Sequence, residues 1–363
     1  SAARGLPVIN ECGGKRISSA CAARVFTCPR ASSALKLKMP LFIGAIIAHI
    51  RPMEQPKSNA PQSAPQSASK LAPTPPFDRA LVRARRGRAG KALAGGKLEA
   101  FLYERIAQDL TERLFDVNRK FETALIFGSA ELAGRITALA GDKIGYAVIA
   151  DHTNFAHGVQ IIASEEALPF APARFDLVIS ALSLQSVNAV QAAMGGFQTL
   201  LKPDGLFVGA VLGGNTLSEL RRALYSAEEA VYGRISPRVS PMIDVQQAAQ
   251  LLQAAGFSMP VTDRDYVQVN YKKLGSLFSD LRAMGENNAL SQRAKTPVSK
   301  RFFTALKAAY LAHCEDKEGR YRAGFDLIYM TGWAPHPAQP KPLKPGSAKT
   351  RLSDALGVKE GKL

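Results

Sequence analysis

Cysteine and histidine are scarce in this chain of 363 residues. Three of the four cysteines lie in the first 30 residues, at spacings of nine and seven that match no zinc-binding pair. Cys314 is the one cysteine of the remaining sequence, and such sparse use is typical of a reducing compartment. The five histidines, at positions 49, 152, 157, 313 and 336, lack the spacing of metal ligands. We therefore expect no metal site, with ligands drawn from distant residues as the open alternative.

Two further absences narrow the function classes. No run of residues approaches the roughly 18 apolar residues of a membrane-spanning helix, and Pro40–Ile50 (PLFIGAIIAHI) is too short to span a bilayer. The GxSxG motif of serine hydrolases is missing, so hydrolase chemistry has no support.

Acidic residues are few outside the middle of the chain. The net charge of +17 is concentrated in flanking segments: residues 1–76 carry +8, residues 77–98 carry +6 and residues 334–363 carry +4, which leaves −1 for residues 99–333. A nearly neutral core with basic flanks does not favour nucleic-acid binding. We expect the flanks to dock on acidic partner proteins or on a membrane surface.

The two ends of the chain are expected to lie outside the fold. Residues 1–52 are Arg-rich with one acid, Glu11, which is typical of a transit peptide. The alternative, which we favour, is a natural start at Met53, with the preceding residues translated in error. The Pro/Ser/Gln-rich stretch up to residue 76 predicts a disordered linker, residues 77–97 a basic arm, and residues 336–363 a Pro/Lys-rich tail.

Between residues 98 and 335, short apolar runs alternate with helical periodicity. This pattern predicts an α/β domain with a mostly parallel sheet covered by helices on both faces. The expected strands are 125–127, 146–150, 159–163, 175–181, 206–212, 266–271 and 325–333. Residues 273–312 are expected to form a helical insertion, and Lys202–Gly205 (KPDG) a turn before the fifth strand.

Ligands of parallel sheets bind at the carboxyl ends of the strands, so the residues there are candidates for a cofactor site. They are Gly128, Ser129, Ala130, Asp151, His152, Ser164, Glu165 and Ser180. Asp151 follows Gly128 by 23 residues, a distance at which an acid accepts hydrogen bonds from ribose hydroxyls. The alternative is that Asp151 caps a following helix, because DHTNF resembles a helix start.

A second candidate segment follows the fifth strand. Gly213 and Gly214 precede Asn215 and Thr216, either of which is expected to cap the next helix. Two glycines there allow the backbone to approach a ligand closely, and an ordinary strand-to-helix loop is the equally weighted alternative.

These motifs together resemble class I S-adenosylmethionine-dependent methyltransferases, in which EALPF, FDLVIS and LKPDG mark the third to fifth strands. More narrowly, FDRALVR, LSLQSVN, GGNTLSELR, ISPRVSP, VQVNY and MGENN run in order as in the mitochondrial complex I assembly factors that hydroxylate a protein arginine. The carrier-protein methyltransferases of biotin synthesis share fewer of these motifs. The resemblance implies a Rossmann-like fold with a seven-stranded sheet and S-adenosylmethionine as cofactor. It also implies a protein partner, such as a complex I subunit, in a bacterial cytoplasm at the inner face of the membrane or in the mitochondrial matrix.

The chain departs from the methyltransferase pattern at the cofactor loop. Where the family has DLGCGxG, Ile126 replaces the acid and Ala130 replaces a glycine. Ser164 stands at the adenine-side acid, and Gln185 and Ser186 replace His and Trp. These losses predict weakened cofactor binding.

Two kinds of function therefore stay open. One is an enzyme with a loosened site, which modifies a protein arginine or, as an alternative, methylates a carboxyl group of a small molecule or carrier protein as in biotin synthesis. The other is a non-catalytic assembly chaperone. No catalytic residue is assigned. The substrate-facing candidates are Gln185, Asn188, Gly213, Gly214, Asn215 and Tyr271.

Overall fold

The computed structural model describes residues 74–96, 100–153, 159–314 and 319–340, together with Ser347 and Gly357. The predictions for residues 1–73, for most of the tail and for the helix start within residues 154–158 lie outside this part of the chain. Within it, no helix is long and apolar enough to cross a membrane.

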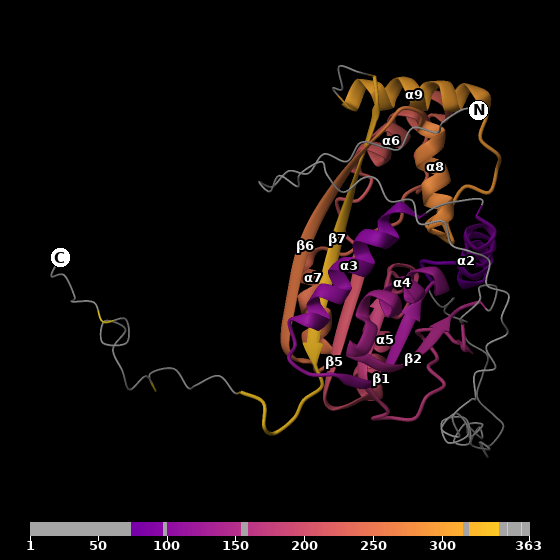
Figure 1. Cartoon of the computed structure of the whole chain (residues 1–363). Helices are drawn as coiled ribbons and strands as arrows, with labels where there is room; N and C mark the ends of the chain where they lie inside the picture. The colour runs from indigo at the N-terminus through magenta and orange to yellow at the C-terminus, as the bar shows by residue number, and fades with distance from the viewer. Residues whose placement is uncertain are drawn as a thin grey trace, which may run out of the picture.

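The domain is built on one seven-stranded sheet in the order β3-β2-β1-β4-β5-β7-β6 (Figure 1). The strands are β1 (Phe121–Gly128), β2 (Ile144–Asp151), β3 (Ile161–Ile162), β4 (Phe175–Ala181), β5 (Leu201–Leu212), β6 (Ser258–Tyr271) and β7 (Tyr321–Trp333). The first five are parallel, whereas β7 is antiparallel to β5 and to β6. This arrangement confirms the predicted fold, a mostly parallel seven-stranded sheet.

Helices cover both faces of the sheet, which is why the central strands are apolar along their length. The helices are α2 (Arg79–Ala94), α3 (Phe101–Phe115), α4 (Ala130–Ala140), α5 (Val190–Leu200), α6 (Ser218–Tyr232), α7 (Val245–Ala254), α8 (Leu274–Ala283) and α9 (Lys300–Cys314). One core cluster joins the sheet to α3, α4, α6, α8 and α9, and a second joins the other face to α5 and α7. The long β6 and β7 run past the parallel strands, and α8 and α9 lie at their far end (Figure 1).

The predicted turn at Lys202–Gly205 is wrong, because these residues continue β5. A register shift against β4 between Phe175 and Leu177 accommodates them, and Asp204 has a left-handed φ of 61°. The strand therefore absorbs Pro203 and the extra residues as a bulge instead of ending.

The basic arm expected over 77–97 is a helix that packs on the domain. Asp78 caps α2 by accepting a hydrogen bond from the N–H of Leu81 at 3.0 Å, and Val82 and Ala89 are buried. The many arginines of this segment lower its apolar content, so its sequence pattern does not indicate a packed helix. The expected helical insertion at 273–312 consists of α8 and α9, with a non-helical stretch between them.

Candidate functional site

The structure brings three of the predicted cofactor residues to one cavity. Asp151 ends β2, and Ser129 and Ala130 connect β1 to α4. They line a cavity of about 220 Å³. The other lining residues include Arg86 and Leu93 of α2, Tyr103 of α3, Leu182 after β4 and Met284 after α8.

Asp151 is 6% exposed, and its Oδ1 accepts a hydrogen bond from the backbone N–H of His152 at 2.6 Å. Burial raises the pKa of Asp151 to about 6, although the charge of Arg86 acts in the opposite direction. The carboxylate is therefore a buried acceptor at the wall of the cavity, and it changes charge near neutral pH.

The loop after β1 keeps its shape for reasons of packing. A Cβ on Gly128 would lie 2.5 Å from the carbonyl oxygen of Ala181 on the neighbouring β4. Ala130 is the first residue of α4, so its methyl group causes no left-handed backbone strain there. Ser129 caps the same helix by accepting from the N–H of Leu132 at 3.3 Å.

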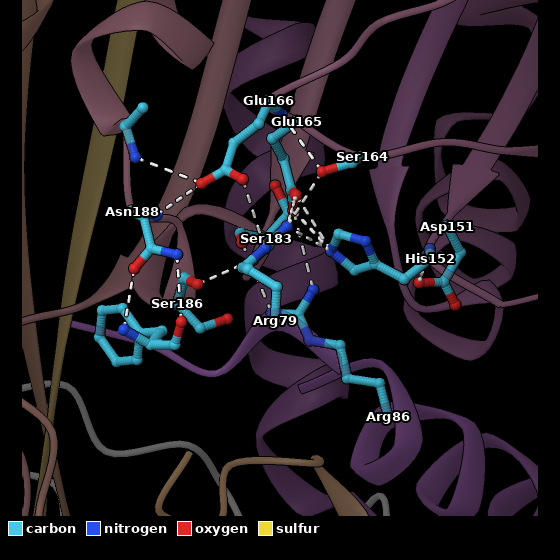
Figure 2. Close-up of polar contacts among 12 residues, drawn as sticks. Arg79, Arg86, Asp151, His152, Ser164, Glu165, Glu166, Ser183, Ser186 and Asn188 are labelled. Atoms are coloured by element: carbon cyan, nitrogen blue, oxygen red, sulfur yellow. Dashed lines mark hydrogen bonds and ion pairs between the residues drawn. The ribbon is translucent and has the colours of Figure 1, made fainter. Parts of the chain in front are cut away.

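A buried ion-pair network closes the neighbouring end of the crevice (Figure 2). The Glu165 side chain is fully buried, and its Oε2 lies 2.7 Å from Nη2 of Arg79. The second oxygen lies 3.8 Å from Nη1 of Arg86, and His152 Nε2 approaches the carboxylate at 3.0 Å. Both arginines come from α2 and are directed at the same carboxylate.

The ion-pair network and its burial account for the shifted pKa values of Glu165 and His152. Burial alone would raise the pKa of Glu165, but the hydrogen bond and charge of His152 and the charges of Arg86 and Arg79 lower it to about 2. Burial lowers the pKa of His152, although its hydrogen bond to Glu165 acts in the opposite direction.

Three predicted cofactor residues are held by α2 and do not line the cavity of Asp151. Arg79 Nη2 donates to Ser164 Oγ at 3.2 Å as well as to Glu165, and it lies 3.4 Å from His152 Nε2. Arg79 Nη1 also donates to the carbonyl of Ser186 at 2.7 Å. The arginine of α2 thus uses acceptors of these side chains, and their direct contact with a cofactor stays a prediction.

Ser180 is not among the residues that line the cavity. It is fully buried, and its hydroxyl lies 2.8 Å from that of Ser183. The hydroxyl pair is satisfied inside the protein, and the cofactor contact of Ser180 stays a prediction.

Most of the substrate-facing candidates have structural partners. Asn188 Oδ1 accepts from the N–H of Phe77 at 2.8 Å, and its Nδ2 donates to the Phe77 carbonyl at 3.1 Å. A Cβ on Gly213 would lie 2.7 Å from Ile328 Cδ1 of β7. Tyr271 is 3% exposed in the core cluster that includes α8 and α9. Each of these residues thus has a structural role, and their contact with a substrate stays a prediction.

The segment after β5 also differs from expectation. Gly214 has ordinary contacts only, at 3.7 Å or more, and Asn215 is exposed, with its N–H donating to Asp326 Oδ2 at 3.2 Å. Neither Asn215 nor Thr216 caps α6, which begins after Leu217 with a left-handed φ of 55° and no side-chain cap. Thr216 instead bonds to the backbone of Asp326 in β7.

Gln185 is the substrate-facing candidate that contacts a carboxylate from a distant part of the chain. Its Nε2 donates to Oε1 of Glu286 at 2.6 Å, across 101 residues of sequence. Sequence reasoning did not select Glu286, nor Arg79 and Arg86. The spacing of the two arginines, seven residues and therefore two helical turns, is the signal that places both on one face of a helix. In the part of the chain that the structure describes, no group of three His, Cys, Asp or Glu side chains is arranged to hold a metal ion.

The sheet order, and an acid at the end of β2 beside the β1–α4 loop, define the fold of class I S-adenosylmethionine-dependent methyltransferases. A family model described as a methyltransferase domain matches residues 129–209. The chain is 35% identical over 295 residues to the mitochondrial arginine-hydroxylase NDUFAF5 of Danio rerio, which covers 79% of this chain and 91% of that protein. The Homo sapiens protein of the same name is 35% identical over 286 residues, with 77% and 82% covered. The chain therefore belongs to the family of the arginine-hydroxylase NDUFAF5.

A more distant relative carries a different activity in its name. The malonyl-[acyl-carrier protein] O-methyltransferase of Xylella fastidiosa is 33% identical over 175 residues, 48% of this chain and 57% of that protein. The methyltransferase fold is thus common to both groups, whereas the similarity to the hydroxylases extends over most of the chain.

Proposed function

We propose that this chain is an enzyme that binds S-adenosylmethionine or a relative of it and modifies an arginine of a partner protein, during assembly of the respiratory NADH dehydrogenase. The observation that carries the proposal is the 35% identity across 91% of a protein named as an arginine-hydroxylase. The partner would be a subunit of that complex. The basic flanks suit docking on an acidic protein or on a membrane surface, and nucleic acid is not among the proposed partners.

The residues at the cavity of Asp151 fit the cofactor in their chemistry. Asp151 supplies a carboxylate for ribose hydroxyls, and Ser129 and Ala130 border the same space. S-adenosylmethionine supplies, when bound, an electrophilic methyl group on a sulfonium. The volume of about 220 Å³ is below the roughly 300–1,000 Å³ of small-molecule sites. Helix α2 lines that cavity, and we expect it to shift when the cofactor binds.

Hydroxylation needs an oxidant in addition to this cofactor, and we assign no catalytic residue to that step. The residues of the chain bind and orient the reactants. Asp151 binds the cofactor, and the groove between α6, α8 and α9 binds the substrate. The proposed compartment is the one in which this enzyme family acts. The relatives carry the word mitochondrial in their names, which favours the mitochondrial matrix, with a bacterial cytoplasm as the alternative.

A second candidate function is an assembly chaperone without catalysis. It is favoured by Arg79, which takes the acceptors of Ser164 and Glu165 at the adenine side of the crevice. It is also favoured by the loss of the glycine at Ala130. A helix that seals a cofactor crevice is what a decayed site would show.

Calorimetric titration of S-adenosylmethionine into the full chain separates the two candidates, with Asp151→Ala as the matched variant. Micromolar binding that the variant loses would support the enzyme. No heat at millimolar cofactor would favour the chaperone, and the search would turn to its partner subunit.

A further inference from the structure

Glu286 lies directly after α8, where Gly285 turns the chain. Gly285 has a left-handed φ of 75°, and the N–H groups of Gly285 and Glu286 close the helix on the carbonyls of Arg282 and Leu281, at 3.2 and 2.9 Å. A Cβ on residue 285 would lie 3.2 Å from Cγ of Arg86, so the turn packs closely against α2. This packing holds Glu286 at the edge of the crevice.

The carboxylate of Glu286 has little to compensate its charge. Its hydrogen-bond partner is the neutral amide of Gln185 at 2.6 Å, and no ion pair to Glu286 is formed within the described ranges. Burial raises the pKa of Glu286, against the opposing effects of the Arg86 charge and the Gln185 hydrogen bond. The residue nevertheless remains partly exposed. A half-buried carboxylate of this kind binds a cation favourably.

The amide of Gln185 orients the carboxylate of Glu286 from the neighbouring cavity of about 290 Å³, which Gln185 lines. A guanidinium is planar and carries five N–H donors, so it can give two parallel hydrogen bonds to one carboxylate. A lysine ammonium lacks this planar fork. The carboxylate of Glu286 therefore favours a guanidinium.

The route to Glu286 suits a long side chain. Glu286 lines a groove of about 270 Å³ between α6, α8 and α9. Its walls are largely apolar, formed by residues such as Leu212, Leu220, Phe278, Leu281 and Phe302. Two cations also line it: Arg238 is paired with Glu228 at 2.5 Å and lies over the Phe302 ring, and Arg282 is exposed. The methylene chain of an arginine can pack along such walls while its charged end reaches further in.

The turn that carries Glu286 also borders the candidate cofactor cavity. Met284, two residues before Glu286, lines the cavity of Asp151, and so does Arg86, against which Gly285 packs. One turn therefore contributes a residue to the groove and a residue to the cavity.

We propose that Glu286, oriented by its hydrogen bond from Gln185, binds the guanidinium of a substrate arginine that enters along the groove between α6, α8 and α9. This assignment rests on the proposed function, because it places the arginine of that reaction. It makes Glu286 a specificity-determining residue and gives no role in bond breaking to it.

The test is binding of N-acetyl-L-arginine methylamide to the full chain by titration calorimetry, with N-acetyl-L-citrulline methylamide as the neutral analogue of the same shape. We expect the arginine probe to bind and the citrulline probe to bind at least about tenfold more weakly. Glu286→Gln should lower the affinity for the arginine probe by roughly 10- to 100-fold and leave the affinity for the citrulline probe unchanged. Glu286→Asp, which keeps the charge, should lie between the two. Glu229→Gln, an exposed carboxylate of α6, is the matched control and should bind as the wild type does.

Cofactor titrations on the same proteins separate the two proposals. If the wild type binds S-adenosylmethionine but Glu286→Gln binds the arginine probe as tightly as the wild type, the assignment of Glu286 is wrong and the enzyme proposal stands. The assignment of Glu286 is also wrong if the wild type binds the cofactor but does not bind the arginine probe. The protein could instead bind the arginine probe through Glu286 and not bind S-adenosylmethionine. That result would support the role of Glu286 and contradict the proposal that the chain uses this cofactor. Thermal melting of each variant checks the fold, and we expect Glu286→Gln to melt no lower than the wild type because it removes a poorly compensated charge.

Discussion

The Nη2 atom of Arg79 lies 2.7 Å from Oε2 of Glu165, whose side chain is fully buried. The pair joins α2, at the start of the described chain, to the loop after β3, and Arg86 reaches the same carboxylate at 3.8 Å. A helix rich in arginine is thereby fixed over the crevice, because the charge of Glu165 is the complement that both arginines share. Helix α2 is thus part of the site and not a loose basic arm.

Replacing Glu165 with Gln should destabilise the protein. The substitution keeps the shape of the side chain but removes the buried charge that two partly buried guanidinium groups share, and breaking a buried ion pair typically costs about 3–5 kcal/mol. Urea denaturation at pH 7 measures the change in the free energy of unfolding. Glu166→Gln is the matched control: that carboxylate lies 3.7 Å from Arg79 and is 27% exposed, so we expect a loss below about 1 kcal/mol. Equal losses in the two variants would contradict the role given to Glu165.

Asn188 is expected to control how firmly α2 is attached. Its side-chain amide holds the backbone of Phe77 through two hydrogen bonds, and Phe77 lines an apolar cavity of about 290 Å³. Asn188→Ala removes both bonds, so amides of α2 should exchange their hydrogens roughly 10- to 100-fold faster, while those of the central strands stay unchanged. Hydrogen-exchange mass spectrometry resolves the two regions. Asn215→Ala, at an exposed side chain, should leave the exchange of α2 as it is. An unchanged α2 in Asn188→Ala would show that other contacts hold the helix.

Gly128 offers a test of the loop after β1 that is independent of any ligand. A methyl group there meets the Ala181 carbonyl oxygen at 2.5 Å, so Gly128→Ala should cost about 2 kcal/mol or more of stability. Gly134 lies in α4 with no atom within 4 Å of an added Cβ, and Gly134→Ala should stabilise by about 0.4–1 kcal/mol. In chemical denaturation, we expect the free energy of unfolding to fall in Gly128→Ala and to rise in Gly134→Ala. A neutral Gly128→Ala would mean that β1 and β4 separate easily at this point.

The sequence predicts the sheet well and the site in part, and particular residues show why. Phe175–Ala181 has the predicted bounds because a short, mostly apolar segment with β-branched residues favours a strand buried on both faces. The third strand shrinks to Ile161–Ile162, since it lies at the sheet edge, where Ile162 is 58% exposed. Edge positions leave a weak apolar signal, so their bounds are hard to predict.

The side-chain network was not predictable from local pattern. Gln185 and Glu286 meet across 101 residues, and Arg79 reaches Glu165 across 86. Composition shows that α2 is basic, but only the fold shows which acid each arginine meets. Asp151 was found because its position at the end of a strand follows from topology alone. Polar partners that depend on the packing of distant elements need the structure.

Asp151 should oppose stability and serve ligand binding at the same time. Its pKa in the folded protein is about 6, above the ordinary 3.8, so between these values the folded state binds more protons than the unfolded state. The stabilisation by the protonated acid is present below about pH 3.8 and is lost as the pH rises through 6. An asparagine at this position would be neutral throughout. Relative to the wild type, Asp151→Asn should therefore gain little stability at pH 3.5 and up to about 3 kcal/mol at pH 7.5.

Urea denaturation of both proteins at a series of pH values measures this difference directly. Glu131→Gln, at a partly exposed side chain that also lines the cavity, is the control for removing a carboxylate beside the same space. The same Asp151→Asn protein should bind S-adenosylmethionine at least about tenfold more weakly if the acid accepts hydrogen bonds from a ribose, because an amide accepts through one oxygen only. A variant that is more stable and binds less is what a functional site predicts. A variant that is less stable at pH 7.5 would instead assign Asp151 to the structural network of α2, and its place at the cavity wall would then need no cofactor to explain it.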